Sequence, residues 1–152
     1  MSERIKTAAL RDFSVSLCRA AGLSADDAAL LTDSILFAEC RGVTSHGLLR
    51  LPQYIARLRS GATASNVPMP FTMESGGTAR LDAQNGLGQL AGRKASDKAE
   101  ELAAEYGVSF VAVANSNHFG TGAWYAIPAA RRGFFAFNIS SAASAMAPHG
   151  AA

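Results

Sequence analysis

The chain has 152 residues, 49% of them hydrophobic, with 14 Lys and Arg against 12 Asp and Glu for a net charge of +2. This composition predicts a folded domain with a substantial core, and the scattered basic residues argue against nucleic-acid binding. Because residues 1–13 mix charged with apolar residues, and no apolar run is long enough to cross a bilayer, we expect a cytoplasmic protein without membrane contact.

Three helices are predicted in the first part of the chain. Apolar residues recur at helical intervals over residues 4–21, which is typical of an amphipathic helix. Ser24 can cap a second helix that continues to about Arg41. A third apolar pattern covers residues 47–58, where Pro52 either kinks the helix or lies near its start.

Mixed structure is predicted after Gly61. Two short β-type runs flank Ser75-Gly76-Gly77, which indicates a hairpin of strands 71–74 and 78–82. The following pattern predicts, in order, a helix (87–106, closed by Gly107), a strand (108–114), a helix (121–132) and a strand (134–139). We therefore expect a mixed α/β fold with an N-terminal helical segment, residues 1–60, and a second region, residues 61–152.

The two cysteines carry no metal or redox signature. Cys18 and Cys40 both fall in predicted helices, and their spacing is that of neither a metal site nor a redox pair. We expect two buried free thiols, with a disulfide as the lesser alternative, and no metal site.

A glycine string raises the possibility of a dinucleotide-binding turn. Residues 86–91, Gly-Leu-Gly-Gln-Leu-Ala, follow a predicted strand and open a helix. That turn also needs an acidic residue at the end of the next strand, where this chain has Asn115, and its strand should not be half of a hairpin. A glycine turn at the start of a helix is the favoured interpretation.

A first polar motif surrounds His46. Ser45 could serve as a nucleophile with His46 as its base, but neighbouring side chains do not face one another on a helix. His46, Arg50 and Tyr54 are spaced four residues apart, so a helix through Pro52 would bring them to one polar face suited to a carboxylate and a proton. The alternative is a capping turn at His46, a solvated Arg50 and a core Tyr54.

A second polar motif, residues 115–122, lies between a buried strand and a helix. Its backbone N–H groups and the helix dipole could receive an anionic group such as phosphate. The alternative is a polar connection with Asn117 in a turn conformation and His118 partly exposed. His149, in Ala147-Pro148-His149-Gly150, is a weaker candidate. The small-residue stretch that follows the last strand leads us to expect an N-terminal portion of a longer protein.

Taken together, residues 41–54, 115–120 and 138–141 with Ala147-Pro148 resemble the malate/L-lactate dehydrogenase family of NAD(P)H-dependent oxidoreductases. This type 2, non-Rossmann family includes dehydrogenases for malate, lactate, sulfolactate and ureidoglycolate and reductases for diketogulonate and cyclic imino acids. The resemblance implies hydride transfer between a nicotinamide and a small 2-hydroxy or 2-oxo acid. One departure is Ala151, where the family's Ala-Pro-x-Gly-Gly has its last glycine.

The resemblance also implies roles for individual residues. Ser45 and His46 match a proton-relay pair, and His118 matches a histidine beside the nicotinamide that some members use as acid or base. Arg50 matches a contact to the substrate carboxylate, and Tyr54, on the same predicted face, is the second residue that we expect to bind substrate. The predicted cofactor contacts are His118, Phe119, Gly120, Thr121, Gly122 and Ser140.

The family fold is mixed α/β with a cofactor domain that is not doubly wound, so residues 61–152 are expected to be the first part of that domain. Members are homodimers whose active site lies near the subunit interface, and they continue well beyond the position of Ala152 with further cofactor contacts and an acidic relay partner. The pattern leaves NAD and NADP as alternatives. The competing hypothesis is an inactive fragment that retains only a dimerisation or partner-binding surface.

Overall fold

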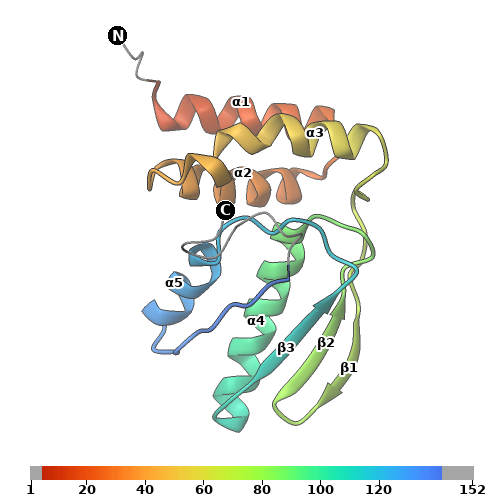
Figure 1. Cartoon of the computed structure of the whole chain (residues 1–152), viewed down its shortest axis with the longest axis vertical. Helices are drawn as coiled ribbons and strands as arrows, with labels where there is room; N and C mark the ends of the chain where they lie inside the picture. Colours follow the sequence, from red (N-terminus) through yellow and green to blue (C-terminus); the bar gives the residue numbers. More distant parts are fainter. Residues whose placement is uncertain (1–4, 142–152) are drawn as a thin grey trace, which may run out of the picture.

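Three N-terminal helices form one end of the molecule, as the sequence predicted. The computed structural model describes residues 5–141. Its first helices are α1 (Thr7–Ala20), α2 (Ala25–Glu39) and α3 (Leu51–Arg59), which lie together as one layer (Figure 1). The Ser24 hydroxyl accepts a hydrogen bond of 3.2 Å from the Asp27 N–H, which confirms the predicted cap of α2.

The helix α3 begins next to Pro52 rather than bending at it. Two 3₁₀ turns, η1 (Thr44–His46) and η2 (Leu48–Arg50), precede it. Pro52 lies in the first turn of α3, where its missing N–H would have no helical partner in any case. This is the second of the two predicted possibilities, and it places His46 and Arg50 outside the α-helix.

The helical layer is stabilised by its own apolar core. Cys18, Leu31 and Ile35 are buried there with Leu51 and Tyr54 of α3. The prediction of a buried thiol is confirmed for Cys18 but is wrong for Cys40, which is exposed because it follows the last turn of α2 at the molecular surface. Both cysteines are free thiols, so the disulfide alternative is not realised.

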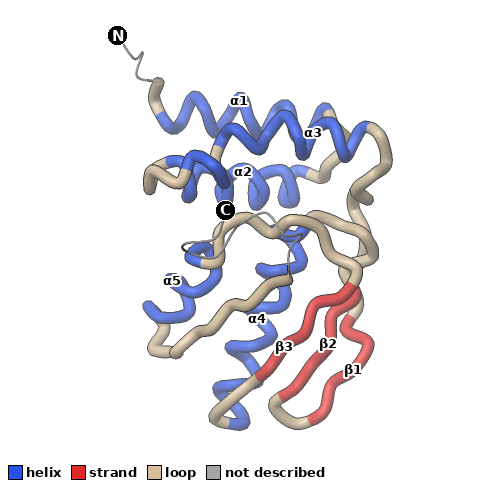
Figure 2. The backbone as a smooth tube through the Cα atoms, viewed as in Figure 1, coloured by secondary structure: helices blue, strands red, loops and turns tan. Residues whose placement is uncertain are grey.

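A small mixed sheet forms the second layer (Figure 2). The strands β1 (Phe71–Ser75) and β2 (Thr78–Asp82) form the predicted antiparallel hairpin. The helix α4 (Gly88–Tyr106) connects β2 to the parallel strand β3 (Phe110–Ala114), and α5 (Ala123–Arg131) follows. The sheet order is β1-β2-β3, and α4 packs against β2 and β3.

Buried residues between sheet and helix hold this layer together. Leu81 on β2 is fully buried with Ala91 and Ala95 of α4, and Leu90 contacts both this core and the helical one. The end of α4 is the predicted Gly107, whose φ of +81° is a left-handed conformation that glycine adopts without strain. The fold is therefore mixed α/β, as expected.

The predicted strand over residues 134–139 is wrong. This segment pairs with no strand of the described residues, and Figure 1 shows it crossing in front of α4 between α5 and β3. Its alternating apolar residues point into solvent, with Phe135 94%, Phe137 77% and Ile139 78% exposed. Alternation is a strand signal only when a neighbouring strand supplies the hydrogen-bond ladder, and residues 5–141 supply none here.

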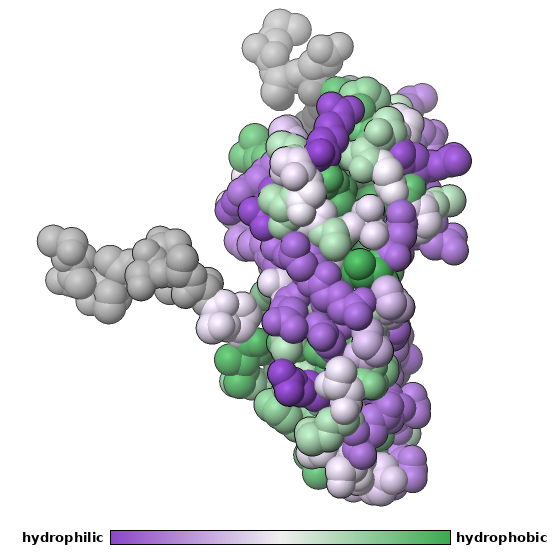
Figure 3. All heavy atoms as spheres, turned by 90° about the vertical axis from the view of Figure 1, so that its right-hand side faces the viewer, coloured by the Kyte–Doolittle hydropathy of each residue, from purple (hydrophilic) through white to green (hydrophobic). Residues whose placement is uncertain are grey.

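The hydropathy of the surface on the strand side varies along the molecule. In Figure 3, hydrophilic side chains gather across the middle of this face, where the helical layer meets the strands and their connections. Among residues 5–141, no helix has both the length and the apolar character that crossing a bilayer requires.

Candidate active site

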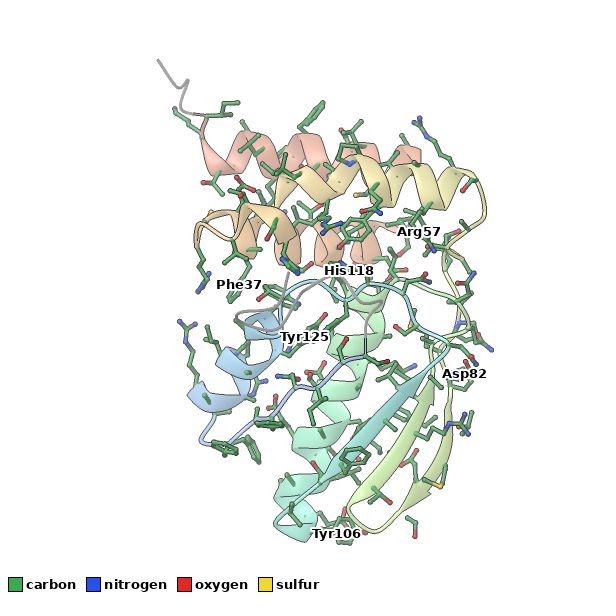
Figure 4. The ribbon with its side chains drawn as sticks, viewed as in Figure 1. Phe37, Arg57, Asp82, Tyr106, His118 and Tyr125 are labelled. Carbon is green, nitrogen blue, oxygen red and sulfur yellow. The ribbon has the colours of Figure 1, made fainter. Side chains whose placement is uncertain are left out.

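The loop after β3 carries His118 to the junction of the two layers. Figure 4 shows this side chain between the N-terminal helices and the upper end of α4. The loop leaves the sheet at the carboxyl end of β3, beside the parallel strand β2, and such ends are where open α/β sheets place ligands. The alternative with His118 partly exposed is also met, because the residue is accessible to solvent.

Three rings from three different elements meet at this point. The Tyr54 hydroxyl of α3 lies 2.7 Å from Nδ1 of His118. The imidazoles of His46 and His118 have their centroids 5.3 Å apart, with an angle of 31° between their planes. The structure therefore brings together three of the predicted site residues.

Ser45 and His46 form a hydrogen-bonded pair. The Ser45 Oγ lies 3.0 Å from Nδ1 of His46. The expectation that neighbouring side chains cannot face one another is wrong here because it assumed an α-helix, whereas these residues form the 3₁₀ turn η1. The short serine side chain can then reach Nδ1, the ring nitrogen nearer the histidine backbone.

Arg50 is held by the same turn. Its Nε donates to the Ser45 carbonyl oxygen at 2.7 Å, and its Nη1 donates to Oε1 of Gln53 at 3.0 Å. The shared face was predicted from a continuous helix through Pro52, and that helix is wrong. Gly47 lies between η1 and η2, and its ψ of −142° interrupts the helical conformation. His46 and Tyr54 nevertheless converge, because both lie against His118.

The surroundings of His118 and Tyr54 favour the neutral form of both side chains. Burial lowers the pKa of His118, and the nearby positive charges of His46 and Arg50 lower it further. Burial raises the pKa of Tyr54, although the hydrogen bond from Gln89 and the charge of Arg50 oppose the rise. At neutral pH the cluster thus holds a neutral imidazole against a protonated phenol.

The sequence of the chain matches a known family profile over residues 5–152, and the description of that family is malate/L-lactate dehydrogenase. The chain belongs to the malate/L-lactate dehydrogenase family. The resemblance inferred from the motifs is confirmed.

Two relatives of the family illustrate the similarity. Malate dehydrogenase from Pyrococcus abyssi is 34% identical over 147 residues, which are 97% of this chain and 41% of the relative. The (2R)-3-sulfolactate dehydrogenase (NADP(+)) from Chromohalobacter salexigens is 35% identical over 150 residues, which are 99% of this chain and 45% of the relative. The chain thus spans less than half the length of these relatives.

A solved structure shows the same fold. Malate dehydrogenase from Pyrococcus horikoshii OT3 superposes with a TM-score of 0.84 at 32% identity, covering 86% of this chain and 38% of that one. The helical layer and the small sheet described above are therefore the fold of this part of the family.

Gln89 is a site residue that the sequence analysis missed. It is fully buried in the first turn of α4, and its Nε2 donates to the Tyr54 hydroxyl at 2.6 Å. The string containing it was interpreted only as a glycine turn. A polar residue among apolar neighbours in the buried first turn of a helix was the available signal, since a buried amide needs partners.

Arg57 and Asn117 were also missed, and they anchor the loop that carries His118. Nη2 of Arg57 donates to Oδ1 of Asn117 at 2.8 Å. Nδ2 of Asn117 donates to the backbone oxygens of Asn85 and Gly86 at 2.9 and 3.0 Å. The turn conformation expected at Asn117 occurs instead at Asn115, with a φ of +51°.

The start of α4 does not offer a dinucleotide-binding turn. A Cβ at Gly88 would overlap the carbonyl oxygens of Asn117 and His118. The close approach that glycine permits here is therefore to the chain's own loop rather than to a pyrophosphate. This supports the favoured interpretation of residues 86–91 as a glycine turn at the start of a helix.

The segments predicted to contact a cofactor lie side by side. Nδ2 of Asn138 donates to the Gly122 carbonyl oxygen at 3.4 Å, which joins residues 138–140 to the loop at 119–122. Phe119 stacks on Tyr125 with ring centroids 5.5 Å apart. Both Thr121 and Ser140 retain accessible surface. His149 and the Ala147–Ala151 motif lie outside the described residues.

Proposed function

We propose that this chain forms the proton-transfer and carboxylate-binding part of an NAD(P)-dependent oxidoreductase that interconverts small 2-hydroxy and 2-oxo acids. The observation that carries the proposal is the pair of imidazoles, His46 and His118, with centroids 5.3 Å apart beside Arg50. Reduction of a 2-oxo acid needs a group that gives a proton to the oxygen and a cation that holds the carboxylate. The cluster contains both.

Each side chain has a distinct task in this proposal. Arg50 binds the substrate carboxylate, and its bonds to Ser45 and Gln53 hold the guanidinium in place. His46 and His118 face the substrate oxygen, and Ser45 supports His46. Tyr54 acts on His118 instead of touching substrate, because its buried hydroxyl is already engaged by His118 and Gln89.

The same proposal assigns a cofactor region. A bound nicotinamide would accept or supply the hydride, and His118, Phe119–Gly122 and Ser140 would hold it. The contact between Asn138 and Gly122 supports this assignment because it brings the two segments together. We keep both NAD and NADP, and the proposal includes residues 61–152 as part of a cofactor domain, a homodimer and a cytoplasmic location.

The test combines turnover with ligand binding. The purified protein is mixed with NADH or NADPH and a series of 2-oxo acids, and cofactor oxidation is followed by absorbance. In parallel, oxalate, a dicarboxylate that mimics a 2-oxo acid, is titrated while the histidine signals are observed by NMR. We expect oxidation with at least one acid, and oxalate shifts at His46 and His118 that Arg50→Gln abolishes.

The competing hypothesis of an inactive fragment predicts a different outcome. A folded dimer that oxidises neither cofactor and whose imidazole signals do not shift when oxalate is added would overturn the proposed function. Arg59→Gln is the matched control, because Arg59 is an exposed arginine at the end of α3 and lies outside the cluster. Its oxalate response should equal that of the unaltered chain.

A further inference from the structure

We propose that a chain of hydrogen-bond donors running from Gln89 through Tyr54 to His118 fixes the neutral His118 imidazole with its proton on Nε2. In this arrangement His118 offers an N–H to the substrate oxygen, and His46 is the histidine that gives and takes the proton. The role of His46 as the proton-transferring histidine rests on the proposed function, whereas the tautomer of His118 rests on geometry alone.

The first step concerns the backbone donor at His118. The N–H of Gly120 points at Nδ1 of His118, with the two nitrogens 3.3 Å apart. A backbone N–H can only donate, so Nδ1 must present a lone pair to it. In a neutral imidazole the proton is then on Nε2.

The second step is the direction of the Tyr54 hydroxyl. The phenol oxygen receives the Nε2 donor of Gln89 at 2.6 Å and lies 2.7 Å from Nδ1 of His118. With Nε2 of Gln89 donating to the phenol oxygen, the single hydroxyl proton is directed to His118, while Oε1 of Gln89 is buried without a hydrogen-bond partner among residues 5–141. Two donors therefore converge on the same nitrogen, and a proton placed there would face both of them.

The third step contrasts the two histidines. Nδ1 of His46 is paired with the Ser45 hydroxyl, which can either donate or accept. His46 keeps a partner whether Nδ1 is protonated or not, as a group that cycles between the two states requires. Nδ1 of His118 has no such freedom, and burial together with the charges of His46 and Arg50 also lowers the pKa of His118.

Gln89 is therefore a positioning residue rather than a catalytic one. It is fully buried in α4, and its Cγ and Nε2 lie against Gly120, at 3.8 and 3.6 Å from the position a Cβ would take there. It thus contacts the loop that bears the second donor as well as the phenol. A residue with only a packing role would not determine which nitrogen of His118 carries the proton.

The experiment reads the tautomer directly. Long-range ¹H–¹⁵N NMR spectra of the ¹⁵N-labelled chain, without cofactor or substrate, distinguish a protonated from an unprotonated ring nitrogen. His46→Gln and His149→Gln assign the remaining signals to His118. We expect Nε2–H for His118 in the unaltered chain, and finding Nδ1–H there would overturn the proposal.

Gln89→Glu tests the direction of the donor chain. At a pH where the new carboxylate is ionised, it can only accept a hydrogen bond. The Tyr54 hydroxyl then donates to this carboxylate, which leaves the phenol oxygen to accept a hydrogen bond from His118. We expect the proton of His118 to move towards Nδ1 and the population of imidazolium to rise. An unchanged tautomer in folded Gln89→Glu would overturn the assignment to Gln89.

Gln89→Met is the matched control. It fills a similar volume but adds no acceptor, so Gly120 and Tyr54 still donate and the Nε2–H form should persist. The same shift towards Nδ1 in Gln89→Met would show a packing effect and would overturn the proposal. These spectra need no turnover, so they test the tautomer independently of activity. A protein that is inactive on every 2-oxo acid would refute the proposed function alone.

Discussion

The Tyr54 hydroxyl and Nδ1 of His118 are 2.7 Å apart although 64 residues separate them in the chain. The contact joins α3 of the helical layer to the loop after β3. A parallel contact between Arg57 and Asn117, 60 residues apart, lies on the same loop at 2.8 Å. The cluster of His46, Tyr54 and His118 is thus assembled where the two layers meet, so its geometry depends on their packing.

His118 should make stability depend on pH. Its pKa in the folded chain is lowered from 6.5, chiefly by burial, so between the two values the unfolded chain binds more protons. The free energy of unfolding should therefore fall as the pH drops from about 6.5 towards the folded value, and this contribution should be constant above 6.5. Urea unfolding between pH 5 and 8 measures it. His118→Gln should show a shallower dependence, and equal slopes would contradict the prediction.

Arg50→Lys should weaken binding of a 2-oxo acid. A lysine cannot reproduce the planar fork that holds Ser45 and Gln53 while pairing with a carboxylate. Loss of a charged hydrogen bond of about 1.5–3 kcal/mol predicts a rise in Kd of roughly ten- to a hundredfold. Isothermal titration with oxalate checks it, and Arg59→Lys should leave the affinity unchanged. Equal affinity of both variants would remove Arg50 from the carboxylate site.

Gly88→Ala should destabilise the junction of the two layers. The added Cβ would overlap the carbonyl oxygens of Asn117 and His118, so the loop must move. We expect a loss of about 1–3 kcal/mol in the free energy of unfolding, together with altered His118 NMR signals. Gly122→Ala is the control, because its φ is −59° and its Cβ would make an ordinary contact of 3.6 Å with Asn138. Its stability should stay within about 1 kcal/mol of the original.

Ser14 and Ser34 should respond oppositely to alanine. The Oγ of Ser14 is buried in α1 without a hydrogen-bond partner among residues 5–141, whereas the Oγ of Ser34 in α2 donates to the Leu31 carbonyl oxygen at 3.0 Å. Ser14→Ala should be neutral or stabilising, and Ser34→Ala should cost about 0.5–1.5 kcal/mol. Thermal unfolding of the pair tests this, and a larger loss at Ser14 would mean that its hydroxyl has a partner.

Phe135 and Phe137 should matter for association rather than for stability. Both are exposed, at 94% and 77%, so Phe135→Ser with Phe137→Ser should change the free energy of unfolding by less than about 0.5 kcal/mol. The double variant should bind less of a hydrophobic dye and scatter less light in solution. Leu81→Ala, at a fully buried position, should by contrast cost about 2–5 kcal/mol. Unchanged dye binding would contradict the exposed position of the two rings.

Local patterns predicted most of the secondary structure. The Ser24 cap, the hairpin at 71–82 and the glycine that ends α4 follow from interactions within a few residues of the chain. The strand expected at 134–139 did not form, because a strand also needs interactions that are not local. Apolar alternation is local, but a strand needs a partner that lies elsewhere, and the described residues place none beside it.

The sequence by itself determined which residues are candidates for the chemistry. The motifs around His46 and His118 contain the histidines, and Arg50 follows one of them within four residues. Only the tertiary structure decided how they are arranged. Gln89 donates to Tyr54, 35 residues away, and the Tyr54 hydroxyl lies 2.7 Å from Nδ1 of a histidine 64 residues away. A hydrogen bond's direction depends on which donors and acceptors meet in space, and no periodicity along the chain encodes that meeting.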